Sequence, residues 1–366
     1  MKKIGIAASV VFAVIIIGLM LINIQEGEFD VTKEKTTVGL ILYGTAGDKS
    51  WGQAHLEGLE ASAVELNLRI LYREKVKEGA ECTAAIEELI GAGCKIIILT
   101  SYAYGDNLAE VALKYPQVYF FHAAGVQQGY KNVSTYFGRI YQMRYLSGIV
   151  AGLKTETDQI GYVAAHEISE VNRGINAFAL GVRSVNPDAV IHICFSGTWT
   201  EDDATRTAAN SLFDAHDIDV VAMHTDSLAV LKEADARGIY SIGYNYDNSQ
   251  YFPDTFLTAP VWDWERFYSQ HILHCIQGKL SGESYWEGVE SGVVSLAPLT
   301  KNVSPGTAEK VDQAWEALRQ GRFDVFYGPI CDNNGNFRVL EGENMSDNAL
   351  LNEFDWYVAG VRRHEE

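Results

Sequence analysis

The sequence predicts an α/β protein built from two doubly wound, Rossmann-like lobes. From about residue 37, short apolar runs alternate with amphipathic segments, which is typical of parallel sheets covered by helices on both faces. The alternation comes in two series of similar length, one on each side of residue 153. Two successive series favour two lobes over one large sheet.

The first series contains brief runs that are rich in branched or aromatic residues and apolar on both faces. Such runs are typical of strands buried inside a parallel sheet. Between them, apolar residues recur at three- and four-residue spacing, and one of these helical segments ends on glycine. We expect strands at 38–43, 95–100 and 118–122, and helices at 54–66 and 82–93.

The second series repeats this pattern after a connecting segment, residues 136–153, that carries the chain from one lobe to the other. The same periodicities identify its elements. We expect strands at 159–165, 190–195, 218–224 and 239–244, separated by helices at 171–185, 202–215 and 227–238.

The regular alternation ends after residue 248. A helix is expected over about 262–280 and another near 308–321, and the polar DNNGN turn at 332–336 indicates a hairpin. We expect this tail to return to the first lobe and to finish on the second. Lobe 1 is then 36–153 plus about 255–283, and lobe 2 is 154–254 plus about 284–366.

The N-terminus differs from the rest of the chain. Lys2 and Lys3 precede an uncharged run, residues 4–24, which is long enough to cross a bilayer as a helix. We interpret residues 1–30 as a signal anchor that holds the following chain on the extracytoplasmic face of the cell membrane. A cleaved signal peptide is the alternative, although its apolar core is normally shorter.

Charge and cysteine content exclude several classes of protein. The formal net charge is −19, and the basic residues are scattered, whereas nucleic-acid binding needs clustered Lys and Arg. The five cysteines are odd in number and form no C-x-x-C pair, so neither a disulfide framework nor a zinc site is indicated. We predict no nucleic-acid partner and no metal.

The sequence offers no catalytic chemistry that we can identify. No G-x-S-x-G elbow, Walker loop or G-x-G-x-x-G fingerprint follows a candidate strand, and the nine histidines are dispersed. We therefore predict no catalytic residue and no cofactor. Two lobes with polar and aromatic residues at their strand ends suit a binding protein better than an enzyme.

Polar and aromatic residues gather where strands are expected to end, which is where open α/β sheets bind ligands. A tryptophan in such a turn often only clamps a helix onto its sheet, but several aromatic residues at one edge favour a flat, uncharged ligand stacked between rings. Nearby polar side chains would then bond the ligand's edge, or would only cap helices. The candidate binding residues are Asp48, Trp51, Gln53, Tyr102, Asn172, Trp199, Asp226, Asp247 and Trp262.

Four stretches resemble a known family. GDKSWGQAHLEGLEAS (47–62) is similar to the DKSFNQ-type stretch of the basic membrane proteins, the substrate-binding components that include the purine nucleoside receptors. GRIYQMRYLSGIVAG (138–152), EVNRGINAFALGVRSVNP (170–187) and GYNYDN (243–248) follow in the family's order. The resemblance runs from about residue 37 to near the C-terminus. It implies a type I periplasmic-binding-protein fold, with two lobes joined by hinge strands and a purine held in the cleft between them.

The resemblance also implies roles for single residues. Trp51 occupies the position of the family's stacking aromatic residue, Asp48 and Gln53 keep their motif positions, and Asp247 matches a ribose-binding aspartate. Three departures are Gly52 in place of an asparagine, HTDS (224–227) in place of a glycine-rich turn, and Trp262 where a lysine that helps to hold the sugar is expected.

The change at Trp262 bears on the ligand, because an indole offers one N–H where a lysine offers three donors. We therefore predict a receptor that hands a purine nucleobase, such as adenine or hypoxanthine, to ABC permease and ATPase subunits. A purine nucleoside or another flat heterocycle is an alternative ligand, with Trp262 serving only as packing. A ligand-sensing ectodomain of a signalling system is an alternative role for the same fold.

Overall fold

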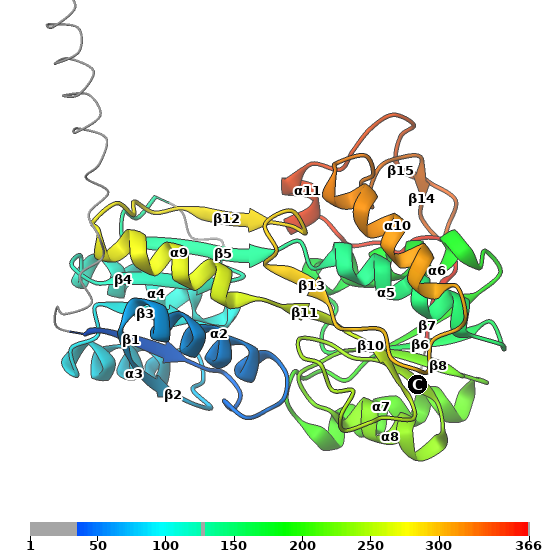
Figure 1. The fold of residues 1–366 in the computed structure, drawn as a ribbon, viewed down its shortest axis with the longest axis horizontal. Coiled ribbons are helices and arrows are strands. Elements are labelled where there is room, and N and C mark those ends of the chain that lie inside the picture. The colour runs from blue at the N-terminus through cyan, green and yellow to red at the C-terminus, as the bar shows by residue number, and fades with distance from the viewer. Residues whose placement is uncertain (1–34, 126–128, 365–366) are drawn as a thin grey trace, which may run out of the picture. The chain divides into compact units, whose positions relative to one another are not determined.

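Two six-stranded sheets organise the chain (Figure 1). The computed structural model describes residues 35–125 and 129–364. The first sheet has the strand order β12-β5-β4-β3-β1-β2 and the second the order β10-β9-β8-β6-β7-β16. The pairs whose register is defined in these sheets are parallel. The expected α/β class is therefore confirmed, and we call the two sheets with their helices the first and second lobes.

The three strands expected in the first lobe form the centre of its sheet. The central strand, β3, is fully buried because its four residues are all Ile or Leu. The sequence did not reveal β2, which lies at the sheet edge and has only one buried residue, Leu68. The elements of this part are β1 (Thr36–Ile41), α2 (Trp51–Leu66), β2 (Leu68–Arg73), α3 (Ala80–Gly91), β3 (Ile96–Leu99), the 3-10 turn η1 (Tyr102–Tyr104), α4 (Gly105–Lys114), β4 (Tyr119–Ala123) and β5 (Val133–Gly138).

The second lobe follows the predicted alternation closely. Its helices α5 and α6 pack against each other, and their approach depends on glycine. A Cβ atom at Gly148 would lie 2.1 Å from the backbone oxygen of Phe178, and one at Gly181 would lie 2.0 Å from that of Tyr145. The elements are α5 (Tyr141–Lys154), β6 (Gln159–Ala164), α6 (Ser169–Val185), β7 (Val190–Phe195), α7 (Asp202–Ala215), β8 (Val220–His224), α8 (Ala229–Arg237) and β9 (Tyr240–Ile242).

The tail crosses between the lobes, and the expected hairpin is present as β14 and β15. After the second sheet gains β10, the chain passes through β11 to α9, which packs on α2 of the first lobe. It returns through β13, which pairs antiparallel with β11. The elements are β10 (Phe256–Thr258), β11 (Pro260–Trp262), α9 (Trp264–Ile276), β12 (Ser284–Glu287), β13 (Val294–Leu296), α10 (Thr307–Arg319), β14 (Ile330–Cys331), β15 (Phe337–Val339), α11 (Asp347–Asn352) and β16 (Val361–Arg363).

Strand pairing differs from the expected lobe boundaries at three places. β10 was expected in lobe 1 but pairs with β9 of the second sheet, and β12 was expected in lobe 2 but pairs with β5 of the first. Helix α5, expected in lobe 1, packs on α6. Short tail strands carry no periodicity that assigns them to a sheet, because the choice depends on which edge is free.

Three side chains of α6 hold the C-terminal segment. Asn172 Nδ2 donates to the backbone oxygen of Phe354 at 2.9 Å, and Arg173 Nη1 donates to that of Leu350 at 2.5 Å. Asn176 Nδ2 donates to the Trp356 oxygen at 2.8 Å. These bonds lead the chain to β16, which pairs with β7 at the edge of the second sheet.

Two expectations from the sequence concern disulfide bonds and the membrane. None of the five cysteines forms a disulfide. Among the described residues, none of the helices is both long and apolar enough to cross a membrane. The predicted signal anchor, residues 1–30, lies outside the described residues.

Candidate ligand-binding site

The turn between β1 and α2 is built around Asp48. Its Oδ1 accepts hydrogen bonds from the backbone N–H groups of Ser50 (2.8 Å) and Gln53 (3.0 Å), and its Oδ2 accepts from that of Gly52 (2.9 Å). Burial raises the pKa of this carboxyl group, although the same backbone bonds oppose the rise. A Cβ atom at Gly52 would lie 2.1 Å from the Thr45 oxygen, so this form of the turn requires glycine where the family has asparagine.

Trp51 is the first residue of α2 and remains partly exposed. Its indole Nε1 donates to the backbone oxygen of Thr100, at the end of β3, over 2.7 Å. Its ring meets those of His55, Trp262 and Trp264 edge to face, with centroids 4.3, 5.5 and 5.7 Å away. The indole is therefore both the clamp of a helix N-terminus and a partly exposed aromatic surface.

Trp262 ends β11, on the segment that crosses back to the first lobe. It is buried, its Nε1 donates to Asn245 Oδ1 at 2.8 Å, and its ring stacks on Trp264 with centroids 4.6 Å apart. Its plane stands at 76° to that of Trp51. The two indoles thus touch each other, and they do not form two parallel walls around a ligand.

A hydrogen-bond network joins the turn before α2 to the second lobe. Ser50 Oγ donates to Asp226 Oδ1 at 3.3 Å, and Asn245 Nδ2 donates to the same oxygen at 2.9 Å. Burial, with a further contribution from Asp48, raises the pKa of Asp226 well above its ordinary value. Two carboxyl groups from different lobes are thus held close to one serine.

Two further side chains, Lys49 of the turn and Gln53 of α2, reach the segment after β9. Gln53 Nε2 donates to Tyr246 Oη at 3.0 Å. The Lys49 ammonium group lies 3.5 Å from the centre of the Tyr251 ring, and the Lys49 backbone oxygen accepts from Asn248 Nδ2 at 3.2 Å. One short segment of the first lobe therefore makes several contacts with the second.

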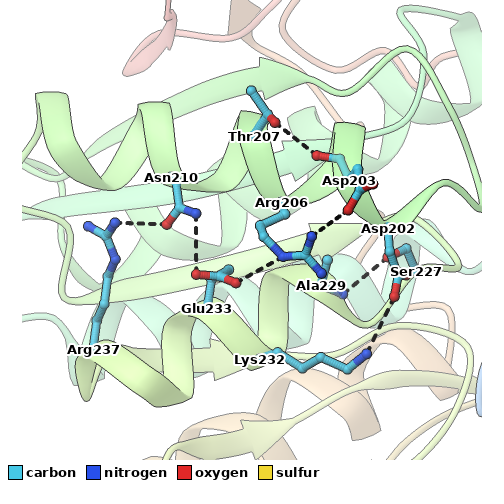
Figure 2. Close-up of polar contacts among 10 residues, drawn as sticks. All are labelled: Asp202, Asp203, Arg206, Thr207, Asn210, Ser227, Ala229, Lys232, Glu233 and Arg237. Atoms are coloured by element: carbon cyan, nitrogen blue, oxygen red, sulfur yellow. Dashed lines mark hydrogen bonds and ion pairs between the residues drawn. The ribbon is translucent and has the colours of Figure 1, made fainter.

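Asp226 is positioned from outside the site by the polar network between α7 and α8 (Figure 2). Asp202 Oδ1 accepts from Ser227 Oγ at 2.5 Å, and Lys232 lies 3.5 Å from the other Asp202 oxygen. The backbone N–H of Asp226 donates to the oxygen of Trp199 at 2.8 Å. Asp202 therefore fixes the turn that carries Asp226.

A polar pair, the buried His224 and the partly exposed Glu170, lies beside the turn that carries Asp226, and the sequence reasoning missed it. His224 Nε2 lies 3.3 Å from Glu170 Oε1, and His224 Nδ1 lies 3.0 Å from Tyr162 Oη. Burial and Arg144 lower the pKa of His224 to about 4. Burial opposes the ionisation of Glu170, but His224, Arg173 and Arg144 outweigh it, so the pKa of Glu170 is lowered.

The structure brings only some of the candidate residues together. The contacts above link Asp48, Trp51, Gln53, Asp226 and Trp262. Trp199 joins them through its bond to Asp226. The same region contains four residues that the sequence did not single out, Ser50, Asn245, Glu170 and His224. Such residue types at a strand end or helix start are common caps. Their position was the only signal that could have identified them.

Three candidates are engaged elsewhere or lie apart. Tyr102 is 62% exposed on η1. The amide of Asn172 is held by the C-terminal segment, since its Oδ1 also accepts from Tyr357 Oη at 3.0 Å. Asp247 Oδ1 accepts from the backbone N–H of Ser249 at 2.9 Å. Their binding roles stay predictions.

The arrangement is suited to holding a ligand by stacking and hydrogen bonds. Nowhere in residues 35–125 and 129–364 do three or more His, Cys, Asp or Glu side chains gather so that they would hold a metal ion. The site offers two partly exposed indoles, those of Trp51 and Trp199, together with carboxyl groups from both lobes and a neutral buried histidine.

Comparison with known proteins identifies the family. A family model described as "ABC transporter substrate-binding protein PnrA-like" matches residues 35–320. A purine-binding protein from Brucella abortus (strain 2308) is 35% identical over 334 residues, which cover 90% of this chain and 93% of that protein. A putative ABC transporter glucose-binding protein from Haloferax volcanii is 33% identical over 329 residues, covering 90% and 81%.

The solved structures agree on the fold. An ABC transporter solute-binding protein from Aeropyrum pernix K1 matches with a TM-score of 0.69 at 19% identity, over 79% of this chain and 92% of that one. Together with the two parallel sheets, this match confirms a periplasmic-binding-protein-like fold. The chain belongs to the PnrA-like family of ABC transporter substrate-binding proteins, which are extracytoplasmic solute-binding proteins and not enzymes.

Proposed function

We propose that this protein binds a purine nucleobase between its two lobes and delivers it to an ABC permease and its ATPase. The observation that carries the proposal is Trp51, a partly exposed indole at the start of α2 whose turn contacts the second lobe through Ser50 and Gln53. A base stacked on an aromatic side chain gains roughly 1–3 kcal/mol. The purine-binding relative from Brucella supports this ligand class.

The preference for a base over a nucleoside rests on Trp262. Its single N–H is already donated to Asn245, so it has no donor left for a ribose hydroxyl, whereas a lysine would offer three. Its ring is packed between Trp51 and Trp264. A sugar placed there would have to displace a buried indole.

Thermal unfolding of residues 35–366 with added ligands tests this proposal. Adenine or hypoxanthine should raise the Tm more than adenosine or inosine at the same concentration. An equal or larger shift with a nucleoside would contradict the base preference. A shift with glucose alone would instead favour the sugar ligand suggested by the Haloferax relative.

Substitution of Trp51 tests the stacking role. Trp51→Ala should weaken binding by about 5- to 150-fold, since a stacked base contributes roughly 1–3 kcal/mol. Trp51→Phe keeps an aromatic face and should retain most of the affinity. Isothermal titration calorimetry compares the two. Equal losses in both variants would show that the indole N–H bond to Thr100, and not stacking, is what binding requires.

The partners and the anchor follow from this role. An importer and a signalling system would use the same binding fold, and co-purification with a permease or with a kinase distinguishes them. A membrane anchor at residues 1–30 would tether the protein beside its permease; fractionation of cells expressing the full chain, followed by N-terminal sequencing, tests it.

A further inference from the structure

Hydrogen-bond donors and acceptors are unequally used around the proposed purine site. The donors are engaged within the protein: Trp51 Nε1 with Thr100, Trp262 Nε1 with Asn245, and Gln53 Nε2 with Tyr246. The amide group of Asn245 donates to both Ser50 and Asp226. Arg144 Nε, Arg144 Nη2 and Trp264 Nε1 have no partner among the described residues, but these atoms are buried. A ligand therefore finds few accessible donors here, apart from the indole of the partly exposed Trp199.

Acceptors remain available on the second lobe. Asp226 Oδ1 accepts two bonds, but none of the described residues donates to Oδ2. Glu170 contacts His224 through Oε1 at 3.3 Å, and its Oε2 has no donor among the described residues. The Glu170 side chain is 20% exposed. Asn248, in the neighbouring turn, also has a buried Oδ1 without a donor.

The two carboxyl groups belong to one continuous wall. Glu170 contacts His224, the His224 ring lies 6.1 Å from that of Trp199, and the Trp199 oxygen accepts from the backbone N–H of Asp226. Asp48 faces Asp226 from the first lobe, but its two oxygens are engaged by its own turn.

The positive charges near this wall cannot serve the ligand directly. Arg144 is 0% exposed and Arg173 is 2% exposed. Arg144 Nη1 donates to the Met223 oxygen at 2.9 Å, and its guanidinium lies 3.9 Å from the centre of the Tyr244 ring. Together with His224, these guanidinium groups lower the pKa of Glu170 from within the lobe, which favours its ionised form.

We propose that Glu170 makes this an acceptor wall, which selects neutral purines carrying an exocyclic amino group, such as adenine and guanine, over acidic oxopurines such as xanthine and urate. An amino group donates to a carboxylate, whereas an oxo group presents lone pairs to it and an ionised oxopurine adds charge repulsion. This selectivity rests on the proposed function, because it assumes a purine in this site.

Calorimetric titration of the wild-type protein with adenine, guanine, xanthine and urate tests the wall. Adenine and guanine should bind at least about tenfold more tightly than xanthine and urate, because a site built for one hydrogen-bond pattern rejects ligands that leave it unpaired. If xanthine or urate binds as tightly as adenine, the acceptor wall is wrong while purine binding stands. If none of these purines binds, the proposed function itself fails.

Glu170→Gln identifies the residue responsible. The amide keeps the side-chain shape, removes the negative charge and adds an N–H₂ donor, so xanthine should bind more tightly and adenine more weakly than in the wild type. Such a crossed change cannot arise from general damage to the fold. Glu233→Gln, the same substitution in the α7–α8 network (Figure 2), should leave the adenine-to-xanthine ratio unchanged. Parallel losses for both ligands in Glu170→Gln would overturn the assignment.

Discussion

Single residues at the strand ends serve the fold and offer a binding surface at the same time. Trp51 donates its N–H to Thr100 and Trp262 donates its N–H to Asn245, so each ring offers a ligand only its π-face or its edge. Both carboxyl oxygens of Asp48 accept hydrogen bonds from its own turn and the start of α2, whereas the described residues donate only to Oδ1 of Asp226. The same residue type at two strand ends thus has different capacities, set by the backbone N–H groups nearby.

His224 gives the protein a pH dependence whose sign follows from its burial. The pKa of its imidazole is about 4 in the folded protein, below the ordinary value of about 6.5. The neutral ring therefore contributes stability that is fully present above pH 6.5 and is lost as the pH falls from 6.5 towards 4. His192, whose pKa burial also lowers to about 4, acts in the same direction.

Urea unfolding at pH 7 and pH 5 measures this contribution. The wild type should lose stability between the two, and His224→Gln should lose about 2 kcal/mol less, since an amide does not titrate. His274→Gln, on the partly exposed side of α9, should behave like the wild type. An unchanged pH dependence in His224→Gln would mean that the ring is not buried as described.

At the scale of elements, the close contact between α5 and α6 depends on glycine at two positions. Gly148 and Gly181 leave no room for a Cβ atom against the facing backbone. α6 also holds the C-terminal segment through Asn172, Arg173 and Asn176. The stretch EVNRGINAFALG thus serves helix packing and the docking of the C-terminal segment along most of its length, and Glu170 at its start contacts His224.

Gly148→Ala should destabilise the protein by more than about 3 kcal/mol, because backbone atoms 2.1 Å from the new methyl group must move. Gly91→Ala is the matched control: a Cβ atom at this last residue of α3 meets nothing within 4 Å, so it should be neutral or stabilising by up to about 1 kcal/mol. Chemical denaturation of the two variants checks both values. Equal stabilities would show that α5 and α6 do not pack this closely.

For the whole molecule, three crossings and one turn connect the lobes. The crossings lead from β5 to α5, from β10 through β11 to α9, and from β12 through β13 to α10. Residues 49–53, which end this turn and begin α2, contact Asp226, Asn245, Tyr246, Asn248 and Tyr251 of the second lobe. Binding proteins of two hinged lobes close around their ligands. We expect the contacts of residues 49–53 to stabilise the closed arrangement of the lobes.

Lys49→Ala combined with Ser50→Ala should favour separation of the lobes in the absence of ligand. The change removes the cation–π contact with Tyr251 and the bond to Asp226, each contributing about 1 kcal/mol. Small-angle X-ray scattering should show a larger radius of gyration than in the wild type, and excess adenine should reduce it. Lys114→Ala, whose ion pair with Glu87 lies within the first lobe, serves as the control and should not change the radius.

The sequence by itself determined the local elements, the two series and the edge at which the candidate site lies, since hydrophobic period and strand-end composition are local properties. Their expected positions at strand ends also grouped Asp48, Trp51, Gln53, Asp226 and Trp262 as candidate binding residues. The sequence did not identify Glu170, His224 or Asn245, because such residues look the same in a sequence whether they cap a helix or face a ligand.

Tertiary structure alone decided which sheet β10 and β12 join, how Trp51 and Trp262 meet, and which polar atoms remain unpaired. The sequence of such a short strand does not specify which sheet it joins, so the strand pairs with whichever sheet edge is available beside it. The tryptophans meet edge to face because the chain crosses between the lobes beside the turn before α2. An atom is left without a partner only after every neighbour has been placed, which is why the acceptor wall became visible in three dimensions.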